Sequence, residues 1–167
     1  MKKKILLVLI IIFSCYYWYS FTSESEKYEI LNEIIKDDEL ALFKICTKSD
    51  KIEIFENNLS DFTFLEQLSV NFQKLTQTEH KFKSEKIQYF NRSLNKIEFC
   101  EIIPNCDKQH EIHYKISLPI VSPDKQSVII KITEDCNCML GGQSGTYLYK
   151  KYDGKWKRIK TLNRRIS

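Results

Sequence analysis

Residues 146–161 read Thr-Tyr-Leu-Tyr-Lys-Lys-Tyr-Asp-Gly-Lys-Trp-Lys-Arg-Ile-Lys-Thr, and this stretch decides the fold of the C-terminal half. Runs rich in aromatic and β-branched residues flank the pair Asp153-Gly154. An Asp-Gly pair in this setting specifies a two-residue hairpin turn, because both of its positions tolerate a positive φ. We therefore predict a β-hairpin with strands at residues 146–152 and 155–161.

The hairpin also carries the candidate ligand-binding residues. Counting outward from the turn pairs Tyr152 with Lys155 and Leu148 with Ile159, which gathers aromatic and cationic side chains on one face. These residues are Tyr147, Tyr149, Lys151, Trp156, Arg158 and Lys160. Such a face can bind acidic glycans or lipid headgroups through charge and stacking. It is also typical of an ordinary sheet face on which cationic stems cover aromatic rings.

Upstream of the hairpin, the repeat of apolar residues changes near Asn95 from the three-to-four spacing of a helix to the alternation of a strand. Strands are predicted around 97–99, 112–118 and 128–132, with a type I turn at 122–125. Before this point, Ser23 with Glu26 and Thr63 with Glu66 have the spacing of capping boxes that begin helices. The first helix extends to about Lys36. The second carries an apolar stripe formed by Leu65, Leu68, Phe72 and Leu75.

Two shorter elements complete the predicted order: a further helix from Asp38 through Cys46 and a short strand at 51–55. The expected fold class is α+β, with two to three helices followed by an antiparallel β-meander that ends in the hairpin. No low-complexity segment or repeat divides residues 22–167, so we expect one domain there.

The N-terminus is typical of an export segment. Lys2, Lys3 and Lys4 precede an apolar run, and no further charge occurs before Glu24. This pattern places the remainder of the chain on the extracytoplasmic side of a bacterial membrane. Residues 1–21 fit three alternatives: a lipoprotein signal with Cys15 as the lipidated residue, an uncleaved membrane anchor at residues 5–21, or a cleaved signal. The membrane is thus an expected partner, through residues 5–21 or through a lipid on Cys15.

The charge balance argues against nucleic acid as a partner. The chain has 26 Lys and Arg and 22 Asp and Glu, for a net charge of +4. Without the three lysines of the export segment, 23 cations face 22 anions, which is too even for a domain that captures polyanions non-specifically. We expect no specific nucleic-acid partner, and an envelope protein or an acidic glycan or headgroup instead.

The cysteines are candidates for disulfides, because export leads to an oxidising compartment. Apart from Cys15 the chain contains Cys46, Cys100, Cys106, Cys136 and Cys138. Cys100 and Cys106 flank a turn and could pair locally. Cys136 and Cys138 lie too close along a strand to pair easily, so one of them is expected to bridge elsewhere, for example to Cys46. Because the spacing matches no zinc knuckle, we predict no metal site and no cofactor.

No catalytic motif is complete. His110-Glu111-Ile112-His113 lacks the spacing of a zinc-protease motif and is interpreted as two surface histidines near a strand start. The glycines of 141–145 match neither a P-loop nor a nucleophile elbow and indicate a loop. We predict no catalytic residues and favour a protein without enzymatic activity. A hydrolase-like enzyme working near Cys138, Gly145 and His113 remains an alternative, as does an immunity or inhibitor protein.

The C-terminal third is similar to a group of small bacterial exported or lipoprotein-signal proteins of uncharacterised role. The similarity rests on residues 116–122, 136–142, 150–157 and 166–167, together with the style of the N-terminal segment. Val121 and Arg165 depart from the pattern, where an aromatic residue and a tryptophan are expected. The similarity supplies no activity and no catalytic residues. The function that we expect is that of a membrane-tethered, extracytoplasmic binding or envelope-associated protein.

Overall fold

The computed structural model describes residues 14, 21–54, 59–106, 110–136 and 142–166. Its elements in chain order are α2 (Glu24–Asp37), β1 (Lys44–Cys46), α3 (Phe64–Thr76), the 3-10 helix η2 (Ser84–Lys86), β2 (Gln88–Asn91), β3 (Lys96–Phe99), β4 (Glu101–Ile103), β5 (His113–Ile116), β6 (Ile120–Val121), β7 (Ser127–Asp135), β8 (Gln143–Tyr152) and β9 (Lys155–Ile166). Within these described ranges, no helix has the length and apolar character needed to cross a bilayer. The predicted export segment falls almost entirely outside them and stays a prediction.

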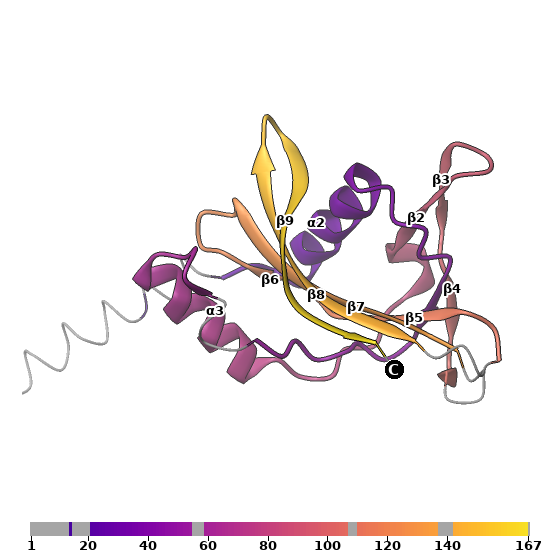
Figure 1. Ribbon diagram of the computed structural model, residues 1–167, viewed down its shortest axis with the longest axis horizontal. Coiled ribbons are helices and arrows are strands. Elements are labelled where there is room, and N and C mark those ends of the chain that lie inside the picture. The colour runs from indigo at the N-terminus through magenta and orange to yellow at the C-terminus, as the bar shows by residue number, and fades with distance from the viewer. Residues whose placement is uncertain (1–13, 15–20, 55–58, 107–109, 137–141, 167) are drawn as a thin grey trace, which may run out of the picture.

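The central feature is a mixed sheet of seven strands in the order β4-β1-β5-β7-β8-β9, with β6 also paired to β7 (Figure 1). From β5 to β9 the strands are antiparallel. Strand β1, however, lies between β4 and β5 and is parallel to both. Strands β2 and β3 form a separate two-stranded sheet. The predicted antiparallel meander is therefore wrong, because a strand from the N-terminal half is inserted among the C-terminal ones.

Two local predictions in the N-terminal half are also wrong. The end of the helix predicted from Asp38 through Cys46 is strand β1, whose residues take backbone partners more than fifty positions further along the chain. Residues 51–54 form no strand, and residues 55–58 lie outside the described ranges. Both helices that begin at capping sequences are confirmed. The hydroxyl of Ser23 accepts the backbone N–H of Glu26 at 3.2 Å, and Thr63 and Glu66 form a complete capping box.

The final hairpin forms as predicted around Asp153 and Gly154, whose φ angles are 51° and 78°. Both positive values fit the primed turn that matches the twist of the strands. The predicted register holds from Tyr152 opposite Lys155 to Tyr149 opposite Arg158. Beyond this point a bulge intervenes, and Leu148 lies opposite Lys160 rather than Ile159. The bulge adds a residue to β9 and bends the hairpin beside α2 (Figure 1).

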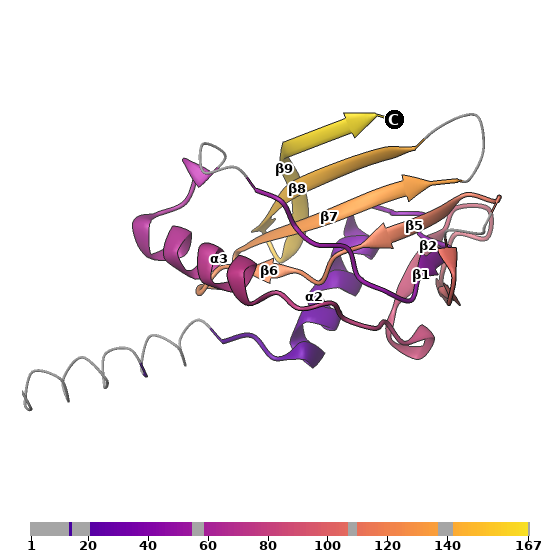
Figure 2. The same ribbon diagram turned by 90° about the horizontal axis from the view of Figure 1, so that it is seen from below.

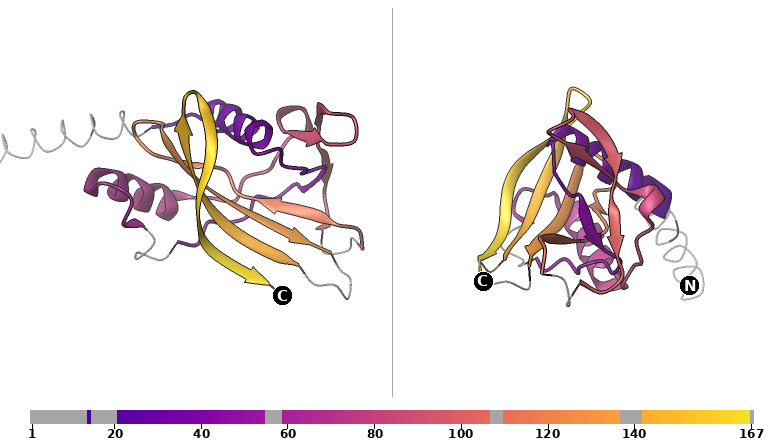
Figure 3. Two further views of the ribbon diagram at one scale, coloured as in Figure 1. Left: turned by 45° about the horizontal axis from the view of Figure 1, so that its top comes forward. Right: turned by 90° about the vertical axis from the view of Figure 1, so that its right-hand side faces the viewer.

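The two α-helices cover opposite faces of the sheet (Figures 2 and 3). Val128 and Ile130 of β7 pack with the α2 residues Ile30 and Ile34. The alternate residue Ile129 packs with a cluster that includes Val70 of α3 and apolar residues of segment 52–62. Successive side chains of a strand point to opposite faces, so this division defines three layers: α2, the sheet, and α3 with its preceding segment. The β2–β3 hairpin lies beside α2 (Figure 3).

Candidate functional site

The face of the hairpin that was expected to bind a ligand lies largely beneath α2. Tyr149 is completely buried and Trp156 is 2% exposed. The Tyr149 hydroxyl donates a hydrogen bond to Asp38 Oδ2 at 2.7 Å, and Trp156 Nε1 donates one to Glu33 Oε2 at 2.8 Å. Burial, together with the hydrogen bond to a carboxylate, raises the pKa of Tyr149 well above its usual value. The aromatic part of the candidate site therefore belongs to the core.

The cations predicted for this face have acidic partners within the protein. Lys151 Nζ lies 2.9 Å from Glu33 Oε2, and Arg158 Nε lies 3.7 Å from Asp38 Oδ2. Lys160 does not share the face as predicted, because the bulge sets it opposite Leu148, which packs on the α3 side of the sheet. Its Nζ lies 2.9 Å from Asp61 Oδ2, and this hydrogen bond lowers the pKa of that carboxyl.

Two of these cations also lie over aromatic rings. Lys151 is 5.2 Å from the ring centroid of Trp156, and Arg158 is 5.2 Å from that of Tyr147. The structure therefore supports the alternative interpretation of this face, in which cationic stems cover rings and tie the hairpin to α2.

The disulfide in the described part of the chain differs from the expected pairing. Cys46 is bonded to Cys106, with Cα atoms 5.8 Å apart, whereas Cys100 is a free, buried thiol. A local Cys100–Cys106 bridge and a bridge from Cys46 to the Cys136 region are both wrong. The reason is the parallel pairing of β1 with β4, which sets Cys46 opposite Ile103, three residues before Cys106. Cys136 is also disulfide-bonded, and Cys15 and Cys138 lie outside the described residues.

His113 does not lie on the surface as predicted, because it is only 1% exposed. Its strand β5 lies between β1 and β7, and its imidazole lies against the buried cysteines Cys46 and Cys106. His110 is exposed as expected. Gly145, expected in a loop, lies within β8 opposite Ile132, where a Cβ atom would overlap the ring of Tyr147.

A pocket of about 320 Å³ opens on the face of the sheet that α3 partly covers. Lys131, Thr133 and Asp135 of β7 line it together with Asp50. Lys131 Nζ lies 3.1 Å from Asp50 Oδ2, and the Thr133 hydroxyl donates to the same carboxylate oxygen at 2.9 Å. These groups satisfy one another, and the pocket holds no arrangement of nucleophile and base that would indicate a reaction.

Helix α3 packs on the domain with its polar side. The sequence did not reveal which side of the helix would face the domain. Gln73 donates from Nε2 to the carbonyl of Val121 at 2.7 Å and accepts the backbone N–H of Val121 at 3.2 Å. Lys74 Nζ donates to the carbonyl of Ile54 at 2.8 Å. Gln67 Nε2 donates to two backbone carbonyls of the preceding segment. These bonds fix the rotation of the helix about its axis.

The apolar stripe of α3 faces outward as a result. Phe64 is 74% exposed and Leu75 is 83% exposed. We call the outward side the α3 apolar face, and its residues are Phe64, Leu65, Leu68, Phe72 and Leu75. The sequence predicted the stripe, but not that it points away from the core. Contiguous exposed apolar patches of this kind mark interaction sites.

The last turn of α3 lies close to Phe21 and Thr22, at the start of the described domain. Phe21 and Thr22 line a pocket of about 350 Å³ together with Gln73 and Thr76 of α3. Thr22 is buried, and Phe21 is 53% exposed. The start of the described domain and the last turn of α3 are therefore neighbours in space.

Comparison with known proteins adds no assignment. No protein-family model matches the sequence, and no curated protein and no solved structure matches it either. The similarity to small exported bacterial proteins thus stays a prediction from the residues that carry it.

Proposed function

We propose that this protein is a membrane-tethered, extracytoplasmic binding module whose α3 apolar face docks on the interfacial region of the lipid bilayer. The observation that carries the proposal is the inverted orientation of α3. Helices at the surface of a domain normally bury their apolar stripe. Here polar side chains hold the helix in place through bonds to the backbone, while Phe64 and Leu75 face outward.

A bilayer is the favoured occupant because of the position of the predicted tether. Residues 5–21, or a lipid on Cys15, would hold the chain at a membrane, and Phe21 adjoins the last turn of α3. Tethering keeps the α3 apolar face at a high effective concentration near the bilayer, so a modest intrinsic affinity is enough. Phenylalanine and leucine are also the residues with which amphipathic helices lie in the interface.

The exposed fractions give the size of the effect. Complete burial of a leucine or phenylalanine side chain contributes about 1.5–3 kcal/mol. Because Phe64 and Leu75 are 74% and 83% exposed, insertion of either side chain is worth about 1–2 kcal/mol, or roughly five- to thirtyfold in partitioning. The face carries few charges, so docking is expected to respond weakly to salt and to anionic lipid.

Photolabelling of the full chain in vesicles tests the proposal. The chain is reconstituted in phosphatidylcholine vesicles that contain a diazirine lipid, photolysed and digested, and lipid adducts are located by mass spectrometry. We expect adducts on residues 64–76 and few on the exposed β2–β3 hairpin. Leu75→Ser together with Phe64→Ser should remove most α3 adducts, whereas Leu94→Ser, at an exposed apolar residue outside the face, should not.

Two results would contradict bilayer docking. Labelling of residues 64–76 no greater than that of the β2–β3 hairpin would refute contact with lipid. Crosslinks between copies through α3, obtained with a diazirine analogue of leucine incorporated at Leu68, would instead assign the face to self-association.

A further inference from the structure

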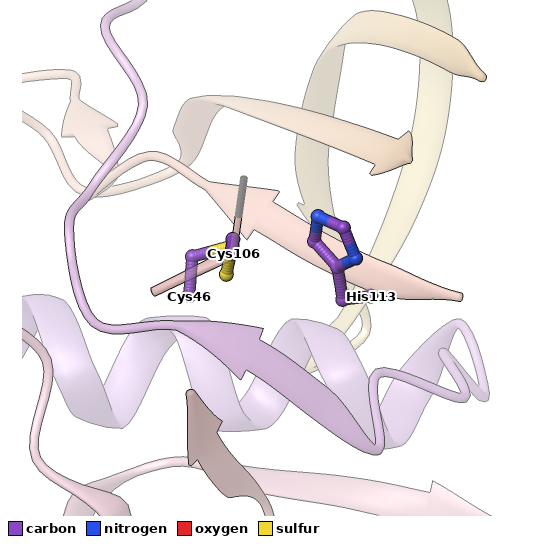
Figure 4. Close-up of side chains that lie close together, drawn as sticks. All are labelled: Cys46, Cys106 and His113. Atoms are coloured by element: carbon purple, nitrogen blue, oxygen red, sulfur yellow. A yellow bond between two sulfur atoms is a disulfide. The ribbon is translucent and has the colours of Figure 1, made fainter. Parts of the chain in front are cut away.

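Side chains from three neighbouring parts of the sheet converge beside β1. Cys46 is the last residue of β1, Cys106 follows β4 by three residues, and His113 is the first residue of β5. Because β1 lies between β4 and β5, all three are brought together (Figure 4). The two sulfur atoms and a ring nitrogen of His113 lie within 4.8 Å of one another, and all three residues are buried.

The imidazole of His113 has one nitrogen in use and one without a partner. Nδ1 lies 3.0 Å from the carbonyl oxygen of Glu111. A carbonyl oxygen only accepts, so Nδ1 is the donor, and in the neutral ring the lone pair is on Nε2. Nε2 is buried and has no hydrogen-bond partner among the described residues. Buried polar atoms are nearly always paired, so a buried imidazole lone pair beside two sulfurs indicates a ligand.

We propose that, once the Cys46–Cys106 disulfide is reduced, the two thiolates and Nε2 of His113 bind one thiophilic d10 cation, with Zn²⁺ as the test ion. Thiolate and imidazole are preferred zinc ligands, and the bond from Nδ1 to a backbone carbonyl is the usual support of a ligating histidine. In a tetrahedral zinc site the ligand atoms are separated by about 3.5–3.8 Å. After the S–S bond is broken, side-chain rotation brings the three atoms to this spacing, and water completes the fourth position.

The two states exclude each other chemically. A dithiol reductant donates two electrons and two protons to the sulfurs of Cys46 and Cys106 and becomes a disulfide itself. Binding of Zn²⁺ then releases the two thiol protons to solvent, without a change in oxidation state. When a disulfide oxidant takes two electrons from the thiolates and is itself reduced to a dithiol, the Cys46–Cys106 bond forms again and the ion is expelled. The site is therefore loaded only in the reduced protein, and this inference does not depend on docking of α3.

Alkylation of the reduced full chain tests the site at the level of single residues. The chain is treated with iodoacetamide with and without one equivalent of Zn²⁺, and modified cysteines are identified by mass spectrometry. We expect at least a tenfold slower modification of Cys46 and Cys106 when Zn²⁺ is present. All three thiols are buried, so each is modified slowly when the domain opens locally; Cys100 lies outside the cluster and is the internal control, because its rate of modification should be the same in both samples. Equal modification of Cys46 and Cys106 with and without Zn²⁺ would overturn the proposal.

Histidine variants and a spectroscopic ion complete the test. His113→Ala should lose the protection by Zn²⁺, whereas the matched variant His110→Ala, at an exposed histidine of the same segment, should keep it. If Cys100 becomes reactive in His113→Ala, the milder His113→Asn takes its place. In the reduced wild-type chain, Co²⁺ should show thiolate charge-transfer bands and the visible bands of tetrahedral coordination. Protection that persists in both His113 variants, or a cobalt spectrum without thiolate bands, would exclude this set of ligands.

Discussion

The Cys46–Cys106 disulfide is expected to be the largest single contributor to stability among the features described above. It joins residues separated by 60 positions. The loop-entropy relation for this separation gives a loss of about 14 cal/mol/K from the unfolded chain, or about 4 kcal/mol at 25 °C. A domain of this size is stable by about 5–15 kcal/mol, so loss of the bond removes a large share of the free energy of unfolding.

The perturbation is the double variant Cys46→Ala with Cys106→Ala, because alanine does not bury a hydroxyl at either site. Urea unfolding of the full chain in mild detergent, followed by circular dichroism, measures the change. If the free energy of unfolding falls by about 2 kcal/mol per M of urea, loss of the cross-link alone should lower the urea midpoint by about 2 M. Cys100→Ala is the matched control, since it removes a sulfur that is also buried but not cross-linked.

Comparison of the two variants can refute the reasoning. Loss of a buried sulfur leaves a small cavity that costs about 1 kcal/mol. If the double variant loses no more than twice the free energy that Cys100→Ala loses, the cross-link constrains the unfolded chain little and the entropy argument fails. A loss of about 4 kcal/mol beyond twice that of the control would support it.

Three further predictions concern the hairpin and its contact with α2. Glu33→Ala leaves the indole N–H of Trp156 buried without an acceptor, and should lower the free energy of unfolding in urea by about 1–3 kcal/mol. In a double-mutant cycle with Trp156→Phe, the coupling energy between the two residues should be at least about 0.5 kcal/mol, and additive losses would contradict the hydrogen bond. Although partial burial opposes ionisation of Glu33, hydrogen bonds from Lys151 and Trp156 lower the pKa of Glu33 below its ordinary value of 4.5. Its contribution to stability is therefore present above pH 4.5 and lost as the pH falls through the lowered pKa, so stability should decline less steeply with acid in Glu33→Gln than in the wild type. Gly154→Ala places a Cβ at a φ of 78° and should cost about 1 kcal/mol, read as a lower melting temperature, whereas an unchanged melting temperature would contradict the strained geometry.

Elements that depend on neighbouring residues were predictable from the sequence. Ser23 and Thr63 begin helices because a hydroxyl three residues before a glutamate satisfies free N–H groups of the first turn. Asp153 and Gly154 specify their turn because both adopt positive φ. The turn at Ser122 closes with a hydrogen bond from Lys125 N to the Ser122 carbonyl at 2.9 Å. In each of these cases the deciding interaction lies within four residues.

The remaining features depend on distant residues, and local patterns do not encode them. Strand β1 carries no alternation that would reveal parallel partners, and that pairing sets both the mixed sheet and the Cys46–Cys106 bridge. The same pairing places Cys46 and Cys106 beside His113, which is buried. The alternation of polar and apolar residues along that strand had predicted a surface position for His113. The direction of α3 is decided by the bonds from Gln73 and Lys74 to backbone groups far away in sequence. The spacing of apolar residues predicts a stripe along the helix, but not whether that stripe faces the core or the solvent.

The face of the sheet beneath α2 is structural, whereas the opposite face carries both proposed sites at separate places. Beneath α2, the aromatic and charged side chains of the hairpin find their partners inside the protein, so that face is structural. The opposite face has α3 near Ile129 of β7 and the Cys–His cluster near the other end, where His113 is paired with Asp135. Ile129 and Asp135 are six steps apart along the strand, a distance of about 20 Å. Lipid labelling of α3 and protection of Cys46 by Zn²⁺ therefore report on separate ends of the domain, and failure of either experiment leaves the other inference standing on its own observations.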